Sequence, residues 1–370
     1  MLIIEIYLFN YSRTISFNKN DNLLPVIITL INMSKDNFDP LSVKPGEKKF
    51  GYVKIIDNLA ISFDMPVGVV YGKKEGSTLA VTGGLYPTEY CGVEAASRLY
   101  NEIEPKDLVG RFISIPVVNM PVFQFRTPWL NLRSSITPFD GGNINAAFPG
   151  NPNGRPTEIL AYKLFEILSK ANFHVDFRGG DLPESHLVHT IYPRIGQKID
   201  ETAEVMAKAF GLDYVLPGTP DIGHTGKGTL VYELATKGVA TIISESGLGF
   251  NTQPSEEEIL PHVEGTKNLL KHFKMMKGKI SKPKKQNFLD MAWQRAAPTK
   301  AGVFMALVDQ GAILKKEQII GQIKDLDGSV IEEIKSPVDG IVHTMYPRRV
   351  VYPGDGLFTI LKIDKTTGWV

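Results

Sequence analysis

Residues that can hold a metal or transfer protons lie just beyond several apolar stretches of this chain. Glu89, Arg178 and Glu245 each follow or end a strand-like stretch of the sequence. A catalytic zinc ion needs about three protein ligands and an open position, and a separate carboxylate can act as general base on the metal-bound water. One carboxylate alone does not hold zinc tightly, so the residues that accompany Glu89 decide which chemistry is available.

Two segments carry the motifs of a possible metal site. Residues 83–92 read Gly-Gly-Leu-Tyr-Pro-Thr-Glu-Tyr-Cys-Gly, and residues 174–184 read His-Val-Asp-Phe-Arg-Gly-Gly-Asp-Leu-Pro-Glu. Both segments resemble the zinc-binding segments of the succinylglutamate desuccinylase/aspartoacylase family, relatives of the zinc carboxypeptidases, which run His-Gly-x-Glu and Asp-x-His-Gly-Gly. Tyr86 and Arg178 stand at the two histidine positions, and only Glu89 matches a metal ligand. The resemblance implies the fold of that family, whereas zinc chemistry is not inherited with it.

Other parts of the family pattern are retained across about residues 50–363. Glu245 matches the family's catalytic glutamate, and Arg126 lies where family members place an arginine that clamps a substrate carboxylate. The stretch 140–150 resembles the family motif Asp-Gly-x-Asn-Leu-Asn-Arg-x-Phe-Pro-Gly. Its two asparagines, Asn143 and Asn145, are therefore implied substrate-binding residues, while Ala146 replaces the arginine of the motif.

The charge of Arg178 offers a replacement for the lost metal. Without the histidines, Glu89 would be a buried carboxylate with no partner, which is destabilising. A guanidinium can pair with two carboxylates, so we expect Arg178 to pair with Glu89, and also with Glu245, at the former zinc position. Two interpretations stay open: Arg178 stabilises an inactive site, or it holds a substrate carboxylate while Tyr86 or Glu245 acts as acid or base.

The remaining histidines allow a second kind of metal site. His174 precedes Asp176 by two residues, so both side chains point to one face of a strand. His186, His189 and His224 lie in predicted loops, and with Glu89 they could rebuild a zinc site. Loop histidines more often bind no metal. His224 is alternatively expected to line the substrate pocket.

The single cysteine and several absent motifs exclude other chemistries. Cys91 lies at a predicted helix start, where a thiol can be activated, but a small buried core cysteine is the more common case. The glycine-rich segment 223–229 lacks the spacing of a phosphate-binding loop. The sequence has no nucleophile elbow and no dinucleotide fingerprint.

Alternating strand and helix patterns predict the scaffold of these residues. Strands are expected at 78–82, 112–118, 174–177 and 239–243, and a helix is expected to start near Pro156. This alternation predicts an α/β domain, with a mixed central sheet flanked by helices as in zinc carboxypeptidases. We place this domain at residues 33–280.

The C-terminal part of the chain has a different pattern. The lysine-rich segment 277–285 reads as a solvated connection, so residues 281–297 are expected to be a linker. In residues 298–370, short apolar runs alternate with glycine turns, which predicts an all-β, barrel-sandwich-like domain. It resembles the hammerhead domains of biotinyl and lipoyl carriers. A lysine is missing from the expected hairpin tip, so a modified swinging arm is not predicted.

Composition sets the broad class of the protein. The 370 residues include 41 basic and 40 acidic side chains, which gives no electrostatic reason to expect a nucleic acid or a membrane as partner. One cysteine excludes an internal disulfide and fits a reducing, cytoplasmic location. Residues 1–32 differ in composition from the rest. We expect them to be a non-native or disordered extension, with Met33 as the true start.

Three functions remain open from the sequence. The first is an enzyme that acts on a small carboxylate-bearing, N-acyl amino acid-like substrate without zinc, by hydrolysis, elimination or rearrangement. The second is a non-catalytic protein that binds such a carboxylate. The third is a zinc-dependent amide hydrolase whose ligands have been rebuilt around Glu89. No cofactor is expected at the family site unless such ligands converge, and the oligomeric state, a homo-oligomer included, is left open.

Overall fold

The computed structural model describes residues 2–8, 11–17, 37–125, 135–181, 184–221, 223–248, 253–281, 283–346 and 349–368. The chain divides into two units, Met1–Phe38 and Asp39–Val370. In the first unit, β1 (Leu2–Leu8) and β2 (Tyr11–Phe17) form an antiparallel pair. Met33, the predicted start, lies outside the described residues.

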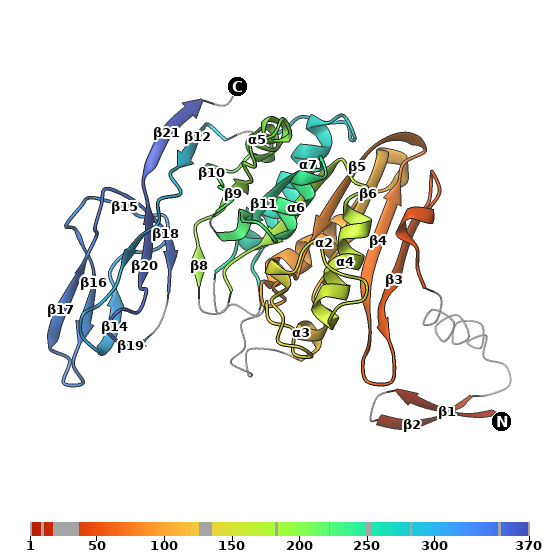
Figure 1. Ribbon diagram of the computed structural model, residues 1–370, viewed down its shortest axis with the longest axis horizontal. Helices are drawn as coiled ribbons and strands as arrows, with labels where there is room; N and C mark the ends of the chain where they lie inside the picture. The colour runs from red at the N-terminus through yellow and green to blue at the C-terminus, as the bar shows by residue number, and fades with distance from the viewer. Residues whose placement is uncertain are drawn as a thin grey trace. The chain divides into compact units, whose positions relative to one another are not determined.

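The second unit is built on a mixed ten-stranded sheet, and Figure 1 shows helices packed along it. Its central strands β11, β7, β5 and β6 are mutually parallel, whereas β9 runs antiparallel to β11 and β4 antiparallel to β6. The carboxyl-terminal halves of these central strands are buried on both faces, and polar residues such as Asp176 and Arg178 of β7 interrupt their apolar sequence. In spatial order the strands are β21 (Ile363–Gly368), β12 (Lys285–Leu289), β10 (Tyr214–Pro217), β9 (His189–Tyr192), β11 (Ala240–Glu245), β7 (Phe173–Arg178), β5 (Lys74–Thr82), β6 (Val109–Ile115), β4 (Ser62–Tyr71) and β3 (Lys48–Asp57).

Two of the described helices begin at capping boxes, in which a glutamate of the first turn accepts a hydrogen bond from the N-cap backbone. α4 (Pro156–Leu168) starts at the predicted proline, and the carboxylate of Glu158 accepts a 2.7 Å hydrogen bond from the backbone N–H of Arg155. α7 (Glu256–His272) repeats this arrangement with Ser255 and Glu258. The other described α-helices are α2 (Tyr90–Glu102), α3 (Met120–Gln124), α5 (Ile199–Phe210) and α6 (Leu230–Thr236).

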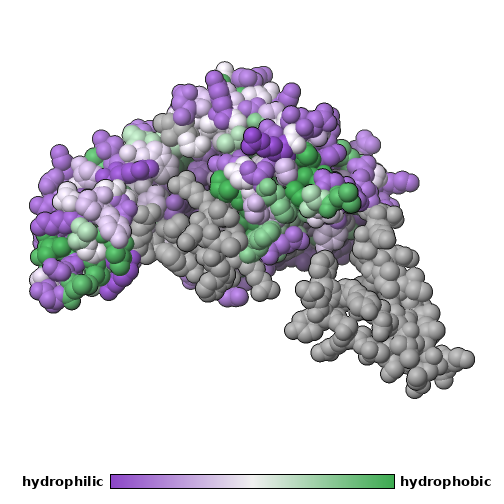
Figure 2. Space-filling model, turned by 60° about the horizontal axis from the view of Figure 1, so that its bottom comes forward, coloured by the Kyte–Doolittle hydropathy of each residue, from purple (hydrophilic) through white to green (hydrophobic). Residues whose placement is uncertain are grey.

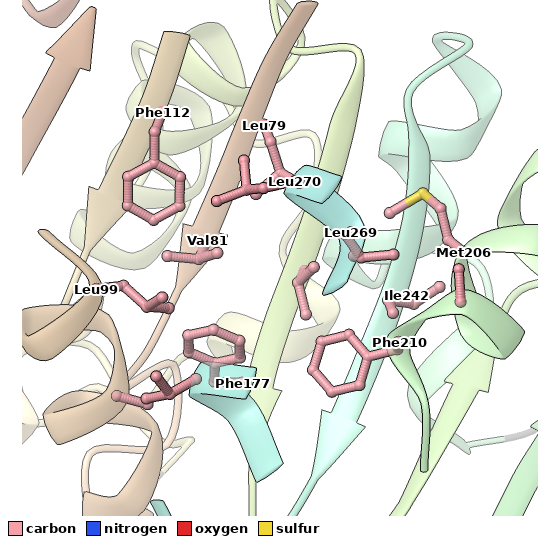
Figure 3. Close-up of a cluster of buried hydrophobic side chains, with 14 of the residues drawn as sticks. Leu79, Val81, Leu99, Phe112, Phe177, Met206, Phe210, Ile242, Leu269 and Leu270 are labelled. Atoms are coloured by element: carbon pink, nitrogen blue, oxygen red, sulfur yellow. The ribbon is translucent and has the colours of Figure 1, made fainter. Parts of the chain in front are cut away.

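The main hydrophobic core lies between the sheet and the helices α2, α5 and α7. Figure 3 shows Phe177 and Val81 from the sheet directed toward Leu99 of α2 and Phe210 of α5. These side chains are all but completely buried. The packing fixes the positions of β5, β7 and β11, the three strands whose ends carry the candidate site.

The C-terminal region consists of two antiparallel sheets around a separate core. One sheet has the order β13, β20, β18, β15, and the other has the order β17, β16, β14, β19. Figure 2 shows hydrophobic side chains gathered on the surface of this region, where Val330, Val350 and Tyr352 are exposed. The strands are β13 (Gln294–Ala296), β14 (Gly302–Ala306), β15 (Ile313–Leu314), β16 (Ile319–Lys324), β17 (Val330–Lys335), β18 (Gly340–Met345), β19 (Val350–Val351) and β20 (Phe358–Leu361).

Two strand exchanges join the C-terminal region to the α/β part. The short strand β8 (Ser185–His186) leaves the α/β part and pairs with β18. In return, β12 and β21 extend the edge of the central sheet beyond β10. Residues 281–297, predicted as a linker, thus contain the strands β12 and β13.

The predicted fold class is confirmed: a mixed sheet flanked by helices is followed by an all-β region. The predicted strands at 78–82, 174–177 and 239–243 lie within or overlap β5, β7 and β11, and 112–118 overlaps β6. Among the residues that the structure describes, no helix is both long and apolar enough to cross a membrane.

Candidate active site

Three neighbouring parallel strands bring the polar residues together at one edge of the sheet. β7 lies between β5 and β11, and Arg178 is the register partner of Glu245. Tyr86 and Glu89 lie in the segment that leaves β5, and Glu89 is the N-cap residue of α2. The carboxyl ends of parallel strands are where α/β proteins form their sites.

A close backbone contact holds the ends of β7 and β11 together. A Cβ atom added to Gly179 would lie 2.2 Å from the carbonyl oxygen of Ser246, so only glycine fits there. The thiol of Cys91 donates a 2.7 Å hydrogen bond to the same carbonyl and is buried. Burial raises the pKa of this thiol, so Cys91 is a core residue, as expected.

Arg178 lies below the site as a buried cation. Its Nε donates a 2.6 Å hydrogen bond to Asp176 Oδ2, and its Nη2 donates a 2.9 Å hydrogen bond to Asn145 Oδ1. The ring of Tyr86 covers the guanidinium, with the Arg178 Cζ atom 4.3 Å from the ring centroid. Burial opposes the charge, but Asp176 and Tyr86 outweigh it and raise the pKa of Arg178 above its usual value.

The predicted partners of Arg178 require a correction. Its ion pair is with Asp176, and among the described residues no ion pair joins it to Glu89 or Glu245. The reason is that Asp176 and Arg178 are two residues apart on one strand, so both side chains lie on the same face. Glu89 and Glu245 act on Arg178 at longer range, and both raise its pKa.

Asp176 also links the site to the predicted His174. Thr82 donates a 2.7 Å hydrogen bond to Asp176 and lies 3.0 Å from His174 Nε2, while His174 Nδ1 lies 2.8 Å from the Thr241 hydroxyl. All four side chains are buried. Burial lowers the pKa of His174 to about 4, so this histidine is a neutral part of the core.

Tyr86 carries its proton at neutral pH, and Glu89 holds its proton more tightly than an exposed glutamate does. Burial raises the pKa of Tyr86 to about 12, although the charge of Arg178 works against this shift. Burial likewise raises the pKa of Glu89 well above its usual value, again opposed by Arg178. Glu89 Oε2 is buried and has no hydrogen-bond partner among the described residues. Tyr86 is therefore a hydrogen-bond donor to anything that enters the site, and Glu89 is one in its neutral form.

Glu245 changes its charge near neutral pH. Burial raises the pKa of its carboxyl group to about 7, whereas the positive charges of His186 and Arg178 hold that pKa down. A carboxylate with such a pKa can both accept and return a proton at physiological pH.

A cavity of about 600 Å³ opens above these residues, between the α/β part and the C-terminal region. From the C-terminal region it takes Trp293, Arg295, Thr344 and Tyr346, which the sequence analysis did not identify. No motif marks them, because Trp293 and Arg295 lie in the predicted linker, and the pattern around Thr344 and Tyr346 predicted only strands and turns. From the α/β part the lining includes Tyr86, Glu89, Ser135, Asn143, Asp181, Glu184, His186, His224 and Glu245.

The predicted substrate-binding residues fall in different places. Asn143 lines the cavity, and its side chain also accepts a 3.0 Å hydrogen bond from the backbone N–H of Asn145. Asn145 is turned to Arg178. His224 lines the cavity as expected, and burial lowers its pKa to about 4. Arg126 lies outside the described residues.

Three buried polar atoms on the wall have no hydrogen-bond partner among the described residues. They are Glu89 Oε2, His224 Nδ1 and Trp293 Nε1. A buried polar atom left unpaired costs about 1–3 kcal/mol, so these atoms are where a ligand or water gains most by binding.

The residues present do not fit a zinc ion at the family's position. A phenol with a raised pKa and a permanently charged guanidinium replace the two imidazoles, and neither can donate a lone pair to zinc in these states. Within the described ranges, no group of three or more His, Cys, Asp or Glu side chains is arranged to hold a metal. His186 and His189 are engaged elsewhere, with Glu184 and with the carbonyl of Leu187.

Comparison with known proteins agrees with this architecture. The model of the succinylglutamate desuccinylase/aspartoacylase catalytic domain matches residues 75–273. The N-alpha-acetyl-L-2,4-diaminobutyric acid deacetylase of Halomonas elongata is 26% identical over 315 residues, which cover 82% of this chain and 87% of that protein.

Two solved structures share the fold. The product-bound ectoine utilization protein EutE (DoeB) from Ruegeria pomeroyi aligns with a TM-score of 0.75 at 23% identity, over 87% of this chain and 98% of that one. A succinylglutamate desuccinylase/aspartoacylase from Rhodobacter sphaeroides aligns with a TM-score of 0.74 at 23% identity, with the same coverage of both chains.

Proposed function

Because the chain belongs to the succinylglutamate desuccinylase/aspartoacylase family, we propose that it is a deacylase that cleaves a small, carboxylate-bearing N-acyl amino acid without zinc at the family's position. The observation that supports this proposal is that a group able to accept a proton at neutral pH and groups able to donate one line the same cavity. Glu245, with a pKa of about 7, shares the wall with the protonated phenol of Tyr86 and with Glu89, whose pKa burial raises.

Each group has a role in amide hydrolysis. Glu245 takes a proton from water while the water oxygen bonds to the acyl carbon. Tyr86 donates a hydrogen bond to the carbonyl oxygen as it becomes negative, and the cation of Arg178 below the ring favours that charge. The C–N bond then breaks, and Glu245 returns its proton to the leaving nitrogen. The products are a carboxylate and an amine.

The remaining groups suit the carboxylate of the substrate. Arg295 contributes a positive charge from the C-terminal region, and Trp293 Nε1 is an unused donor on the same wall. Asn143 adds an amide from the other side. Arg126 is proposed as a further carboxylate-binding residue on the strength of the family pattern.

The first experiment is elemental analysis of protein purified without chelators, for the wild type and for Glu89→Ala. Metal-free wild-type protein supports the proposal. Stoichiometric zinc that is lost in Glu89→Ala would instead mean that a zinc site has been rebuilt around Glu89, and the metal-independent mechanism would fall.

Turnover is then measured on a panel of N-acetyl and N-succinyl amino acids in the presence of a chelator. We expect Glu245→Gln to lower kcat by about 10²–10⁴-fold, since it removes the general base, and the exposed Glu94→Gln to leave kcat unchanged. Substrates that are hydrolysed equally well by wild type and Glu245→Gln would overturn the assignment of the base.

A second candidate is a non-catalytic protein that binds the same class of carboxylate. The observation that favours it is the use of Asn145 by Arg178, which removes an amide from the cavity. Calorimetric binding of N-acyl amino acids by metal-free protein, with no turnover of any of them, would establish this alternative.

A further inference from the structure

A buried histidine cluster lies where β8 of the α/β part pairs with β18 of the C-terminal region. In that pairing His186 is the register partner of Thr344, and Figure 1 shows the two strands side by side. His343 precedes Thr344 on β18, and His189 lies on β9. Their rings are in contact: the centroids of His189 and His343 are 4.6 Å apart, and those of His186 and His343 are 5.6 Å apart.

Hydrogen bonds connect these side chains in a single file that ends on the cavity wall. His189 Nδ1 lies 2.6 Å from the Leu187 carbonyl oxygen, and His189 Nε2 lies 3.3 Å from His343 Nε2. His343 Nδ1 lies 2.8 Å from the Thr344 hydroxyl, which lies 3.2 Å from His186 Nδ1. His186 Nε2 lies 3.1 Å from Glu184 Oε2.

The first bond in the file fixes the direction of the next ones. A carbonyl oxygen can only accept, so His189 must carry its proton on Nδ1. Burial lowers the pKa of His189 to about 3, so this ring holds one proton and its Nε2 is an acceptor. His343 must then donate through its own Nε2.

The same reasoning carries the direction through to the cavity. Burial and the neighbouring histidines lower the pKa of His343 well below 6.5, so it too is neutral, and its Nδ1 accepts from the Thr344 hydroxyl. A hydroxyl that donates its only proton to His343 accepts on its other side, here from His186 Nδ1–H. The remaining nitrogen of His186 faces the carboxylate of Glu184, which accepts only.

We propose that His186 is held as an imidazolium with both of its N–H groups engaged, and that it is the positioning residue which sets the charge of the general base Glu245. The inference rests on the proposed function for the role of Glu245, whereas the protonation of His186 follows from the hydrogen bonds together with the neutral state of His189 and His343. Acidic groups of three segments face it: Glu184 beside it, Asp181 after β7 and Glu245 at the end of β11. His343 and His224 are the neutral rings nearby.

The geometry gives the imidazolium no free N–H for a substrate. It therefore acts through other groups: it fixes Glu184 on the cavity wall, and it lines the same cavity as Glu245, whose pKa its positive charge holds down. Because Thr344 and His343 belong to β18, the C-terminal region determines the protonation of a residue in the α/β part.

The test is NMR titration of ¹⁵N- and ¹³C-labelled histidine in the full chain, which has seven histidines. We expect one ring, assigned to His186 by its absence in His186→Gln, to titrate above pH 6.5 with both nitrogens protonated below that point. His189 and His343 should stay neutral from pH 8 to pH 5. A His186 ring that titrates at or below pH 6.5 would overturn the inference.

Two conservative variants and a control sharpen the test. Thr344→Val removes the acceptor of His186 Nδ1–H, and Glu184→Gln removes the carboxylate, so each should lower the pKa of His186 by about one unit. Glu257→Gln removes a carboxylate that lines a neighbouring cavity with His186 but is not among the groups that shift its pKa, and should leave that pKa within a few tenths. Equal shifts in all three variants would mean a general field effect and would overturn the hydrogen-bond file.

The pH dependence of turnover separates this inference from the proposed function. His186→Gln should move the acidic limb of the kcat/KM profile to higher pH, because Glu245 then loses its nearby positive charge. A protein with the expected titrations and no turnover would refute the proposed function only. If His186→Gln leaves the acidic limb of the kcat/KM profile at the same pH, the role given to His186 is refuted.

Discussion

The Asp176–Arg178 ion pair below the cavity and the histidine file beside it differ in how their buried groups are charged. Below the cavity, Arg178 and Asp176 form an ion pair at 2.6 Å with nearly zero exposure, and the charge of Arg178 does not depend on pH near neutrality. Beside the cavity, His189 and His343 are buried neutral, and only the last ring of the file meets a carboxylate. An arginine cluster is permanent, whereas an imidazole cluster holds its charge pattern only above a threshold pH.

Lowering the pH should give the largest difference between the two regions, because it protonates the buried imidazoles and leaves the charge of the arginine unchanged. The folded pKa values of His174 and His224 are about 4 and those of His189 and His262 about 3, so these residues stabilise the fold fully above the unfolded value of 6.5. That stability is lost as pH falls from 6.5 toward the folded values. Each adds a slope of about 1.4 kcal/mol per pH unit.

Opposing groups reduce this slope without reversing it. Glu89 and Glu245 have raised pKa values, so their contributions are present at low pH and lost as pH rises through those values. The pKa of His186 is also raised, so its contribution to stability is likewise present at low pH and lost as pH rises. The net expectation is a steep fall in the free energy of unfolding between pH 6.5 and pH 5, measured by urea titration. A flat profile over that range would contradict the neutral state of the buried histidines.

Arg178→Met should give the next largest effect. Removing the guanidinium leaves Asp176 as an unpaired buried charge, which costs about 3–5 kcal/mol of unfolding free energy. Arg98→Met is the matched control, since Arg98 pairs with Glu256 on the surface and such pairs contribute about 0–1 kcal/mol. Chemical denaturation at pH 7 measures both. Similar losses in the two variants would mean that the Asp176–Arg178 pair is no more important than a surface pair.

Glu89→Gln should have the smallest effect, and its sign should depend on pH. The raised pKa of Glu89 means that its neutral form is favoured in the folded state and that stability is lost as pH rises through the folded value. Glutamine mimics the neutral form at every pH. The variant should have the same melting temperature as the wild type at pH 5 and a higher one at pH 9. A lower melting temperature of the variant at pH 9 would show that Glu89 is ionised in the folded protein.

The sequence allowed the sheet and the site's edge to be predicted, but not the partners within the site. The apolar stretches of β5, β7 and β11 and the motifs around Glu89 and Glu245 carry enough local information to align the strand ends. Which carboxylate pairs with Arg178 depends on reach across the strand face, and local spacing favoured Asp176 over the motif residue Glu89. Trp293 and Thr344 could not be identified, because only the packing of the C-terminal region brings them to the cavity.

The reciprocal pairing of β8 with β18, and of β21 with β12, has a consequence for how the chain folds during synthesis. His186 of β8 and Thr344 of β18, which both line the cavity, lie 158 residues apart along the chain, and Thr366 of β21 lies 79 residues after its partner Asn287 of β12. Contacts of such long range form late and slowly. A nascent chain therefore carries an incomplete cavity until β18 and Gly356 have been synthesised, because both contribute to the cavity wall.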